Sequence, residues 1–341
     1  MSDQKFFRRF KFMLPANKGI LAMRETTCST LLLVLVISLT GCHEQADGAA
    51  QVGPAAAAAK HFSGKYPVRV VVTTGMVADL VGHVGGSFVE VTSLMGEGVD
   101  PHLYKASSGD VARLGEADAV FYSGLHLEGR MGDVLSRLAS RQPTFAVTDL
   151  LDRQRLLKVG PEQFDPHVWF DVALWSECLT QVEQALAGYD PPHAADYRRQ
   201  AAAYRDELAS LDAWCREQMA AIPTERRVLV TAHDAFHYFG RAYHIEVEAI
   251  QGISTQAEAG VSQINDLVEL ISRRKIKAVF VETSVSERNI RALVEGCAAR
   301  GHRVEIGGQL FSDAMGKPGT PDGTYTGMVR HNVETVRRAL E

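Results

Sequence analysis

The tripeptide Asp-Pro-His occurs twice in this chain, at residues 100–102 and again at residues 165–167, each time followed by an apolar residue and then an aromatic one. Imidazole is the commonest metal-binding side chain in proteins, which makes His102 and His167 candidate ligands. The proline fixes its φ angle and stiffens the chain before the histidine, and the aspartate can accept a hydrogen bond from the imidazole or cap the following helix. The repeated motif is therefore a candidate metal-binding element.

Two further polar side chains stand in similar settings in the second half of the chain. His233 ends the apolar segment "RRVLVTAH", and Asp313 in "QLFSDAMG" follows another strand-like segment. In α/β proteins, ligands bind at the edge where parallel strands end, which is where these side chains are expected. Acids and histidines are common at such edges, so spacing alone supports a metal site and a set of ordinary polar loop residues equally.

The segments around these four residues alternate between strand-like and helix-like patterns, which predicts an α/β fold. Strands are expected at 68–74, 88–95, 119–124, 144–149, 226–232, 245–250, 278–284 and 303–310. Helices are expected at 75–86, at 108–117 with Ser108 as its cap, and at 168–189, 233–243, 264–275 and 287–301.

A long helix is predicted between the two halves. Residues 191–221 have prolines only at the start and no glycine, and apolar side chains recur at helical spacing at Tyr204, Leu208, Leu211 and Cys215. A helix of about 30 residues is about 45 Å long, which suits a rigid connection with little hinge motion. We therefore expect two similar α/β lobes, residues 65–188 and 223–341, joined by a connecting helix within 189–222, with the site between them.

The N-terminal region differs from the rest. Six basic residues precede the apolar run "TLLLVLVISLTGC", which is too short to span a bilayer and is typical of a signal peptide covering residues 1–41. The run ends in a sequence that resembles a bacterial lipobox, which predicts acylation of Cys42. An uncleaved anchor or a secretory signal with a chance cysteine are the alternatives, and Met13 or Met23 could be the true start. Residues 42–64 have the composition of a flexible tether.

Composition and charge exclude some functions. With 46% hydrophobic and 23% charged residues, the chain is typical of a globular protein large enough for two lobes. Without residues 1–41 it keeps 30 basic and 39 acidic residues, a net charge of −9, which argues against nucleic acid as a partner. Cys178, Cys215 and Cys297 lie in apolar helical segments without CxxC spacing, so we expect buried thiols.

Four stretches of the chain, in matching order, closely resemble the TroA-like cluster A-I metal-binding proteins of bacterial ABC importers. They are "GVDPHLYKASSGDVARLGEADAVFYSGLHLEGRM", "FDPHVWFDVALWS", "RRVLVTAHDAF" and "LFSDAMG…GTYTGMVRHNVETV". The resemblance implies two α/β lobes, a rigid connecting helix and one zinc or manganese ion, bound by His102 and His167 from the first lobe and by His233 and Asp313 from the second. It also implies an extracytoplasmic protein anchored through a lipid on Cys42, which we expect to be a monomer, and which passes its ion to a membrane permease served by a separate ATPase subunit.

The sequence leaves the metal open. Three imidazoles and a carboxylate suit zinc and also admit manganese. Manganese-binding relatives often have glutamate where His233 stands, which favours zinc, whereas the His-rich acidic loop of many zinc importers is absent here, which favours manganese. His126 and Glu128 in one loop, and Glu258 and Glu282 after strand-like segments, are candidates for contacts behind the ligands.

Two other functions are alternatives. His233 and His237 have the i, i+4 spacing of a zinc hydrolase motif with Asp234 between them, although the acid is one carbon shorter than the usual glutamate. His237 also departs from the importer pattern, which usually has glycine there. The second alternative is a surface lipoprotein that acts as an adhesin, for which the sequence specifies no partner.

Overall fold

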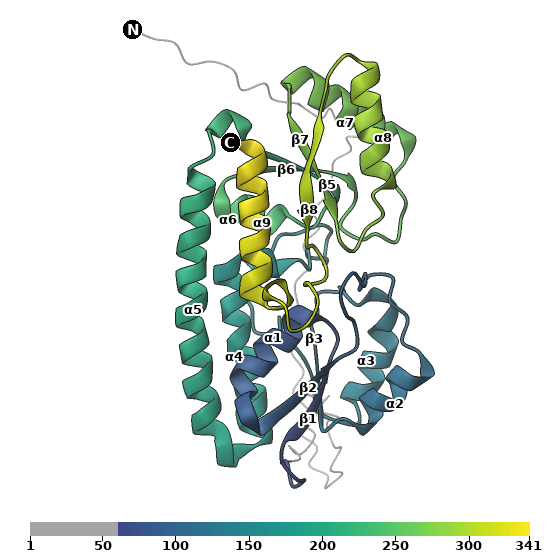
Figure 1. Cartoon of the computed structure of the whole chain (residues 1–341). Coiled ribbons are helices and arrows are strands. Elements are labelled where there is room, and N and C mark those ends of the chain that lie inside the picture. Colours follow the sequence, from purple (N-terminus) through teal and green to yellow (C-terminus); the bar gives the residue numbers. More distant parts are fainter. Residues whose placement is uncertain (1–60) are drawn as a thin grey trace, which may run out of the picture. The chain divides into compact units, whose positions relative to one another are not determined.

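The computed structural model describes residues 61–341, which form two α/β lobes joined by a long helix (Figure 1). The strands of both lobes pair in parallel. The predicted signal peptide and Cys42 lie outside the described residues, as does most of the predicted tether. The first lobe contains a parallel sheet in the order β2-β1-β3-β4. Its strands are β1 (Val68–Val72), β2 (Val89–Ser93), β3 (Ala119–Tyr122) and β4 (Thr144–Ala146).

The helices of the first lobe are α1 (Gly75–Gly85), α2 (Ser108–Glu116), α3 (Gly132–Ala139) and α4 (Val172–Tyr189). The predicted cap of α2 was wrong by one residue. Ser107, and not Ser108, accepts a hydrogen bond from the Asp110 backbone at 3.2 Å, and the Asp110 carboxylate accepts one from the Ser107 backbone at 2.8 Å. This reciprocal arrangement satisfies two backbone donors at the start of the helix. The short helix α3 was not predicted.

The second lobe contains two pairs of parallel strands, with β5 and β7 adjacent. They are β5 (Val228–His233) with β6 (Glu246–Gln251), and β7 (Ala278–Glu282) with β8 (Glu305–Leu310). The helices are α6 (His237–Tyr243), α7 (Val261–Arg274), α8 (Arg288–Ala299) and α9 (Tyr325–Leu340), of which α9 was not predicted. Short 3-10 turns lie at Gly86–Phe88, Gly129–Met131, Val168–Phe170, Pro191–His193, Thr224–Arg226 and Pro321–Gly323. All eight predicted strands are present.

The connecting helix α5 (Ala194–Ala220) confirms the predicted long helix and follows the 3-10 turn at Pro191–His193. Its 27 residues give a length of about 40 Å. It packs against α4 and α1 of the first lobe and against α6 and α9 of the second lobe (Figure 1). Its buried face carries Tyr197, Ala201, Tyr204, Leu208, Leu211, Cys215 and Met219. Because α5 contacts helices from both halves, it fixes the distance between the lobes.

The largest hydrophobic cluster also crosses from one lobe to the other. It includes Val70 of β1, Leu208 of α5, Phe280 of β7 and Tyr325 at the start of α9, all fully or almost fully buried. The lobes therefore share apolar contacts behind the site, beyond the covalent connection through α5. The three cysteines predicted as buried thiols, Cys178, Cys215 and Cys297, are free and buried. Across residues 61–341, no helix has both the length and the apolar character needed to cross a membrane.

Candidate metal centre

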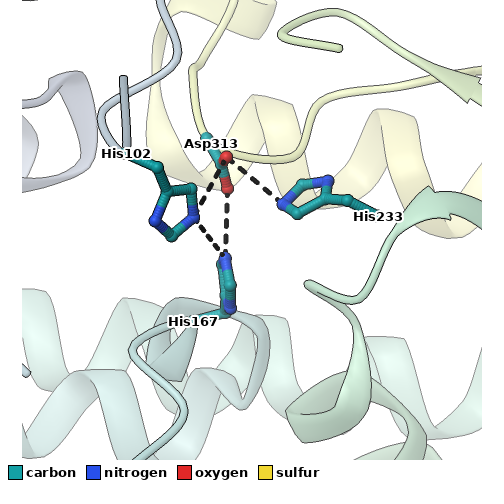
Figure 2. Close-up of side chains that lie close together, drawn as sticks. All are labelled: His102, His167, His233 and Asp313. Carbon is teal, nitrogen blue, oxygen red and sulfur yellow. Dashed lines mark hydrogen bonds and ion pairs between the residues drawn. The ribbon is translucent and has the colours of Figure 1, made fainter. Parts of the chain in front are cut away.

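The four side chains selected from the sequence converge on one point between the lobes (Figure 2). His102 Nε2 lies 3.3 Å from His167 Nε2 and 3.7 Å from Asp313 Oδ2. Asp313 Oδ1 lies 3.4 Å from His167 Nε2, and Oδ2 lies 3.3 Å from His233 Nε2. All four residues are at most 2% exposed. One ligand atom from each residue lies within 4.8 Å of all the others.

Each of these four residues lies in a different segment of the chain. His102 lies in the turn between β2 and α2, His233 is the last residue of β5, and Asp313 follows β8 by three residues. His167 stands directly before the 3-10 turn Val168–Phe170. The chain before His167 forms only an isolated antiparallel bridge between Lys158 and Phe164, so this residue, unlike His233, does not stand at the end of a sheet strand.

The unpaired atoms at this point fit a cation. Within the part of the chain that the structure describes, His233 Nε2 and both Asp313 carboxylate oxygens are buried and make no hydrogen bond. Leaving buried polar atoms unpaired is costly, and a bound cation would satisfy all of them. Ligand atoms about 2.0–2.1 Å from a zinc ion at a tetrahedral centre are about 3.3–3.4 Å apart. The separations between His102, His167 and Asp313 are close to this value, so the group can close on an ion with small movements.

Carboxylates behind the imidazoles orient two of them. Asp165 Oδ1 accepts hydrogen bonds from His167 Nδ1 at 2.7 Å and from the His167 backbone at 3.0 Å. Glu282 accepts from His233 Nδ1 at 2.5 Å and from the His233 backbone at 2.8 Å. Each contact turns the Nε2 atom toward the common point, as carboxylates do for metal-binding histidines.

The aspartate of the first Asp-Pro-His motif acts differently. Asp100 accepts a hydrogen bond from the backbone N–H of His102 at 2.8 Å, and its other oxygen accepts one from the hydroxyl of Thr255 at 2.6 Å. It therefore stabilises the turn that carries His102 and links it to the loop between β6 and α7. The two motifs have the same sequence, but only the second uses its aspartate to orient the imidazole.

The charges in the group shift the pKa values of its members in different directions. Burial lowers the pKa of His102 to about 4 despite the nearby charge of Asp313. For His167, burial is outweighed by Asp165 and Asp313, which raise its pKa to about 9. In the same way Glu282 and Asp313 outweigh burial and raise the pKa of His233 well above its usual value. Burial disfavours the Asp313 carboxylate, but the adjacent imidazoles hold its pKa well below the usual range.

The other candidates from the sequence occupy different positions. Glu282 orients His233, as described above, whereas Glu128 is buried and accepts hydrogen bonds from the Thr73 hydroxyl and from backbone N–H groups near the end of β3. His126 and Glu258 are exposed. The sequence analysis placed both glutamates after strand-like segments, but Glu282 is the last residue of β7, whereas Glu258 lies in the loop seven residues beyond the end of β6.

His237 lies apart from the four converging residues. Its side chain is 42% exposed, with Nε2 at 3.2 Å from Asp234 and Nδ1 at 3.8 Å from Asp165 Oδ2. It stands at the start of α6, while His233 ends β5, so the two histidines are not on one helix as a hydrolase motif requires. The arrangement does not form the His233/His237 site of the alternative hypothesis.

Comparison with known proteins agrees with this geometry. The family described as "ZnuA: Zinc-uptake complex component A periplasmic" matches residues 70–339. The chain belongs to this family. Manganese-binding lipoprotein MntA of Bacillus subtilis is 46% identical over 320 residues, covering 94% of this chain and all of that protein. Zinc-binding protein TroA of Treponema pallidum is 43% identical over 319 residues, covering 93% of this chain and 99% of that protein.

Solved structures show the same fold. The periplasmic zinc-binding protein TroA from Treponema pallidum matches with a TM-score of 0.79 and 47% identity, covering 81% of this chain and 99% of that one. The Fe(III)-bound YtgA from Chlamydia trachomatis matches with a TM-score of 0.73 and 26% identity, covering 80% and 98%. These matches confirm the predicted family and its two-lobed α/β fold.

Membership of the ZnuA family also decides the class of function. Its members are the substrate-binding components of metal ABC transporters, so this chain is a solute-binding protein for import and not an enzyme. Such a component works with a membrane permease and an ATPase. The family description and the names of the relatives, several of them lipoproteins, assign such proteins to the outside of the cytoplasmic membrane.

Proposed function

We propose that this protein captures one Zn²⁺ or Mn²⁺ ion with His102, His167, His233 and Asp313 and delivers it to an ABC permease. The observation that carries the proposal is the convergence of four buried side chains whose facing polar atoms include three without a hydrogen-bond partner among the described residues. Neutral imidazoles and a carboxylate are suitable ligands for both ions.

The position of Asp313 is what admits both metals. Its Oδ1 faces His167 and its Oδ2 faces His102 and His233, so both oxygens are turned toward the ion position. Bound through one oxygen, the carboxylate completes a tetrahedral set of four, which zinc prefers. Bound through both, it gives five donor atoms, and manganese accepts oxygen donors more readily than zinc.

Complete burial of the ligands means that the lobes or their loops must separate for the ion to enter or leave. Two contacts cross between them beside His102: the Thr255 hydroxyl donates to Asp100 at 2.6 Å, and the Gln256 amide donates to the His102 carbonyl at 3.3 Å. The long helix and the shared apolar cluster oppose a wide opening. We infer that loading and release use small tilts and a change in these loops.

The anchoring and assembly of the protein are also proposals. Cleavage after residue 41, acylation of Cys42 and a tether over residues 42–64 would hold a monomer at the membrane surface next to the permease. The first lobe would then extend over residues 65–188, the connecting segment over 189–222 and the second lobe over 223–341. The names of the lipoprotein relatives support the anchor.

Uptake by living cells tests the proposed function. Deletion of the gene should reduce the uptake of radioactive zinc or manganese at low concentrations, and the intact gene should restore it while the His102→Ala form should not. Replacement of Cys42 by Ala should release the protein from the membrane fraction. Unchanged uptake of both metals in the deletion strain, with loss of surface attachment, would contradict the proposal and favour an adhesin.

A further inference from the structure

The loop that carries Asp313 belongs to the second lobe by sequence and is attached to it at its beginning. Asn332 of α9 accepts a hydrogen bond from the Phe311 backbone at 2.9 Å and donates one to the Phe311 carbonyl at 2.7 Å. The hydroxyl groups of Ser312 and Ser284 are 2.8 Å apart. These contacts hold the loop where it leaves β8.

The same loop is also attached to the first lobe. Trp169 Nε1 donates a hydrogen bond to the Ser312 carbonyl at 3.0 Å, directly beside Asp313. At the other end of the loop, the Tyr325 hydroxyl donates to the Trp169 carbonyl at 2.7 Å, and the Tyr325 backbone donates to Asp79 of α1 at 3.0 Å. Thus one residue of the first lobe, Trp169, contacts the loop on both sides of Asp313.

Trp169 also contacts another candidate ligand. Its ring is inclined at 69° to the imidazole of His167, with the ring centres 5.2 Å apart, and the indole is fully buried. The loss of its N–H would leave the buried Ser312 carbonyl without this partner, which costs more than the loss of an exposed hydrogen bond. Trp169 therefore connects the His167 and Asp313 segments.

His233 has a different support. It ends β5 and is held by Glu282 at the end of β7, so both of its hydrogen bonds to that carboxylate lie within the second-lobe strands. Figure 2 shows His233 approaching the ion position from the opposite side to His102.

We propose that Trp169 is a positioning residue that fastens Asp313 to the first lobe, so that His102, His167 and Asp313 remain together while His233 separates when the lobes tilt apart. This proposal rests on the proposed metal-binding function. His102 and His167 belong to this group because they are part of the first lobe, and Asp313 belongs to it because Trp169 holds its loop there. The ion would be held by this three-residue group before His233 closes on it and after His233 leaves.

Titration of the metal-free full chain with Co²⁺ tests this proposal, because the visible absorption of Co²⁺ reports its coordination as well as its affinity. Trp169→Phe should weaken binding about 10- to 100-fold, as is typical when a residue supporting a ligand is lost. It should also change the Co²⁺ spectrum, which a general loss of stability would not do. Trp175→Phe is the matched control, since Trp175 is equally buried but its Nε1 has no hydrogen-bond partner among the described residues.

A second pair of variants tests the grouping of ligands. His233→Ala should still bind one equivalent of Co²⁺ weakly, and adding Trp169→Phe should weaken it again by a similar factor. If Trp169→Phe does not fold, Tyr325→Phe removes the adjoining hydrogen bond and should weaken binding about fivefold. Wild-type affinity and an unchanged spectrum in the folded Trp169→Phe variant, or in Tyr325→Phe if Trp169→Phe does not fold, would overturn this inference alone. Failure of the unaltered chain to bind Co²⁺ would overturn the proposed function with it.

Discussion

The Nδ1 atom of His167 donates to Asp165 Oδ1 at 2.7 Å, which leaves Nε2 as the nitrogen that faces the other candidate ligands. His233 and Glu282 repeat this relationship in the second lobe. A negative charge behind an imidazole fixes its tautomer and makes its free nitrogen a better donor to a metal. Each lobe thus contributes one histidine oriented by a carboxylate.

Replacement of Asp165 by Asn should weaken binding of Zn²⁺ or Mn²⁺ about 10- to 100-fold, because the amide keeps the shape of the side chain but not its charge. Competition with a coloured chelator would measure the change. Asp118→Asn is a suitable control, since Asp118 pairs with Arg69 at the opposite end of β3 and does not contact the centre. Equal affinities in the two variants would show that Asp165 does not act through His167.

Metal binding should release protons and weaken as the pH falls. The carboxylates beside His167 raise its pKa to about 9, and those beside His233 raise its pKa as well, which favours the protonated imidazoles in the metal-free protein. Because these protons must leave before the ion binds, the affinity should fall about tenfold per pH unit for each proton displaced. Calorimetry in two buffers of different ionisation enthalpy would count about two protons per ion. An affinity that is constant between pH 7.5 and 5 would contradict binding by histidine.

Much of this centre was accessible from the sequence, for identifiable reasons. His233 and Asp313 follow apolar strands whose ends the alternating pattern locates, and the repeated motif marks His102 and His167. The orienting role of Glu282 was not accessible, because it depends on the spatial proximity of β5 and β7. Trp169 could be identified as apolar, but its hydrogen bond to the Ser312 carbonyl could not be predicted, because the two residues are 143 positions apart in the sequence.

The secondary structure was likewise predictable from the sequence only in part. The long helix α5 was predicted because its helical repeat extends over many residues, and the eight strands were predicted from the alternation of strand-like and helix-like segments. The helices α3 and α9 were missed, and the start of α6 was placed four residues early because the strand before it continues through His233. Such boundaries depend on hydrogen bonds that form only in the folded chain.

Asp190, at the beginning of the connecting segment, should contribute to stability above pH 4. It accepts hydrogen bonds from Tyr66 at 2.7 Å, Tyr197 at 2.6 Å and His193 at 2.8 Å. Burial would raise the pKa of Asp190, but these donors outweigh it and lower the pKa below the usual value. Asp190→Asn should therefore reduce the free energy of unfolding by about 2 kcal/mol at pH 7.

A group with a lowered pKa in the folded state stabilises the protein above its unfolded pKa and loses this effect as the pH falls through the folded value. The difference between wild type and Asp190→Asn should thus shrink below about pH 4. Urea unfolding at pH 7 and pH 3 would measure it, with the exposed Asp206→Asn as control. A difference that does not depend on pH would show that the Asp190 charge is unimportant.

Replacement of His237 by Ala should change the affinity for Zn²⁺ by less than about threefold, because the four proposed ligands would supply a full tetrahedral set without it. His102→Ala, measured beside it by the same chelator competition, should lose most of the affinity. If His237→Ala instead abolishes zinc binding, the His233/His237 pair would be the site and the hydrolase hypothesis would return.

The most direct test of the four-residue centre is the metal content of the protein. Residues 43–341 would be produced without a histidine tag, and bound metals would be measured by mass spectrometry before and after reloading the stripped protein with zinc and with manganese. We expect one equivalent of zinc or manganese in the unaltered protein and none in His167→Ala. Failure to bind either ion stoichiometrically, or an equal metal content in the two proteins, would contradict the assignment of these residues as ligands.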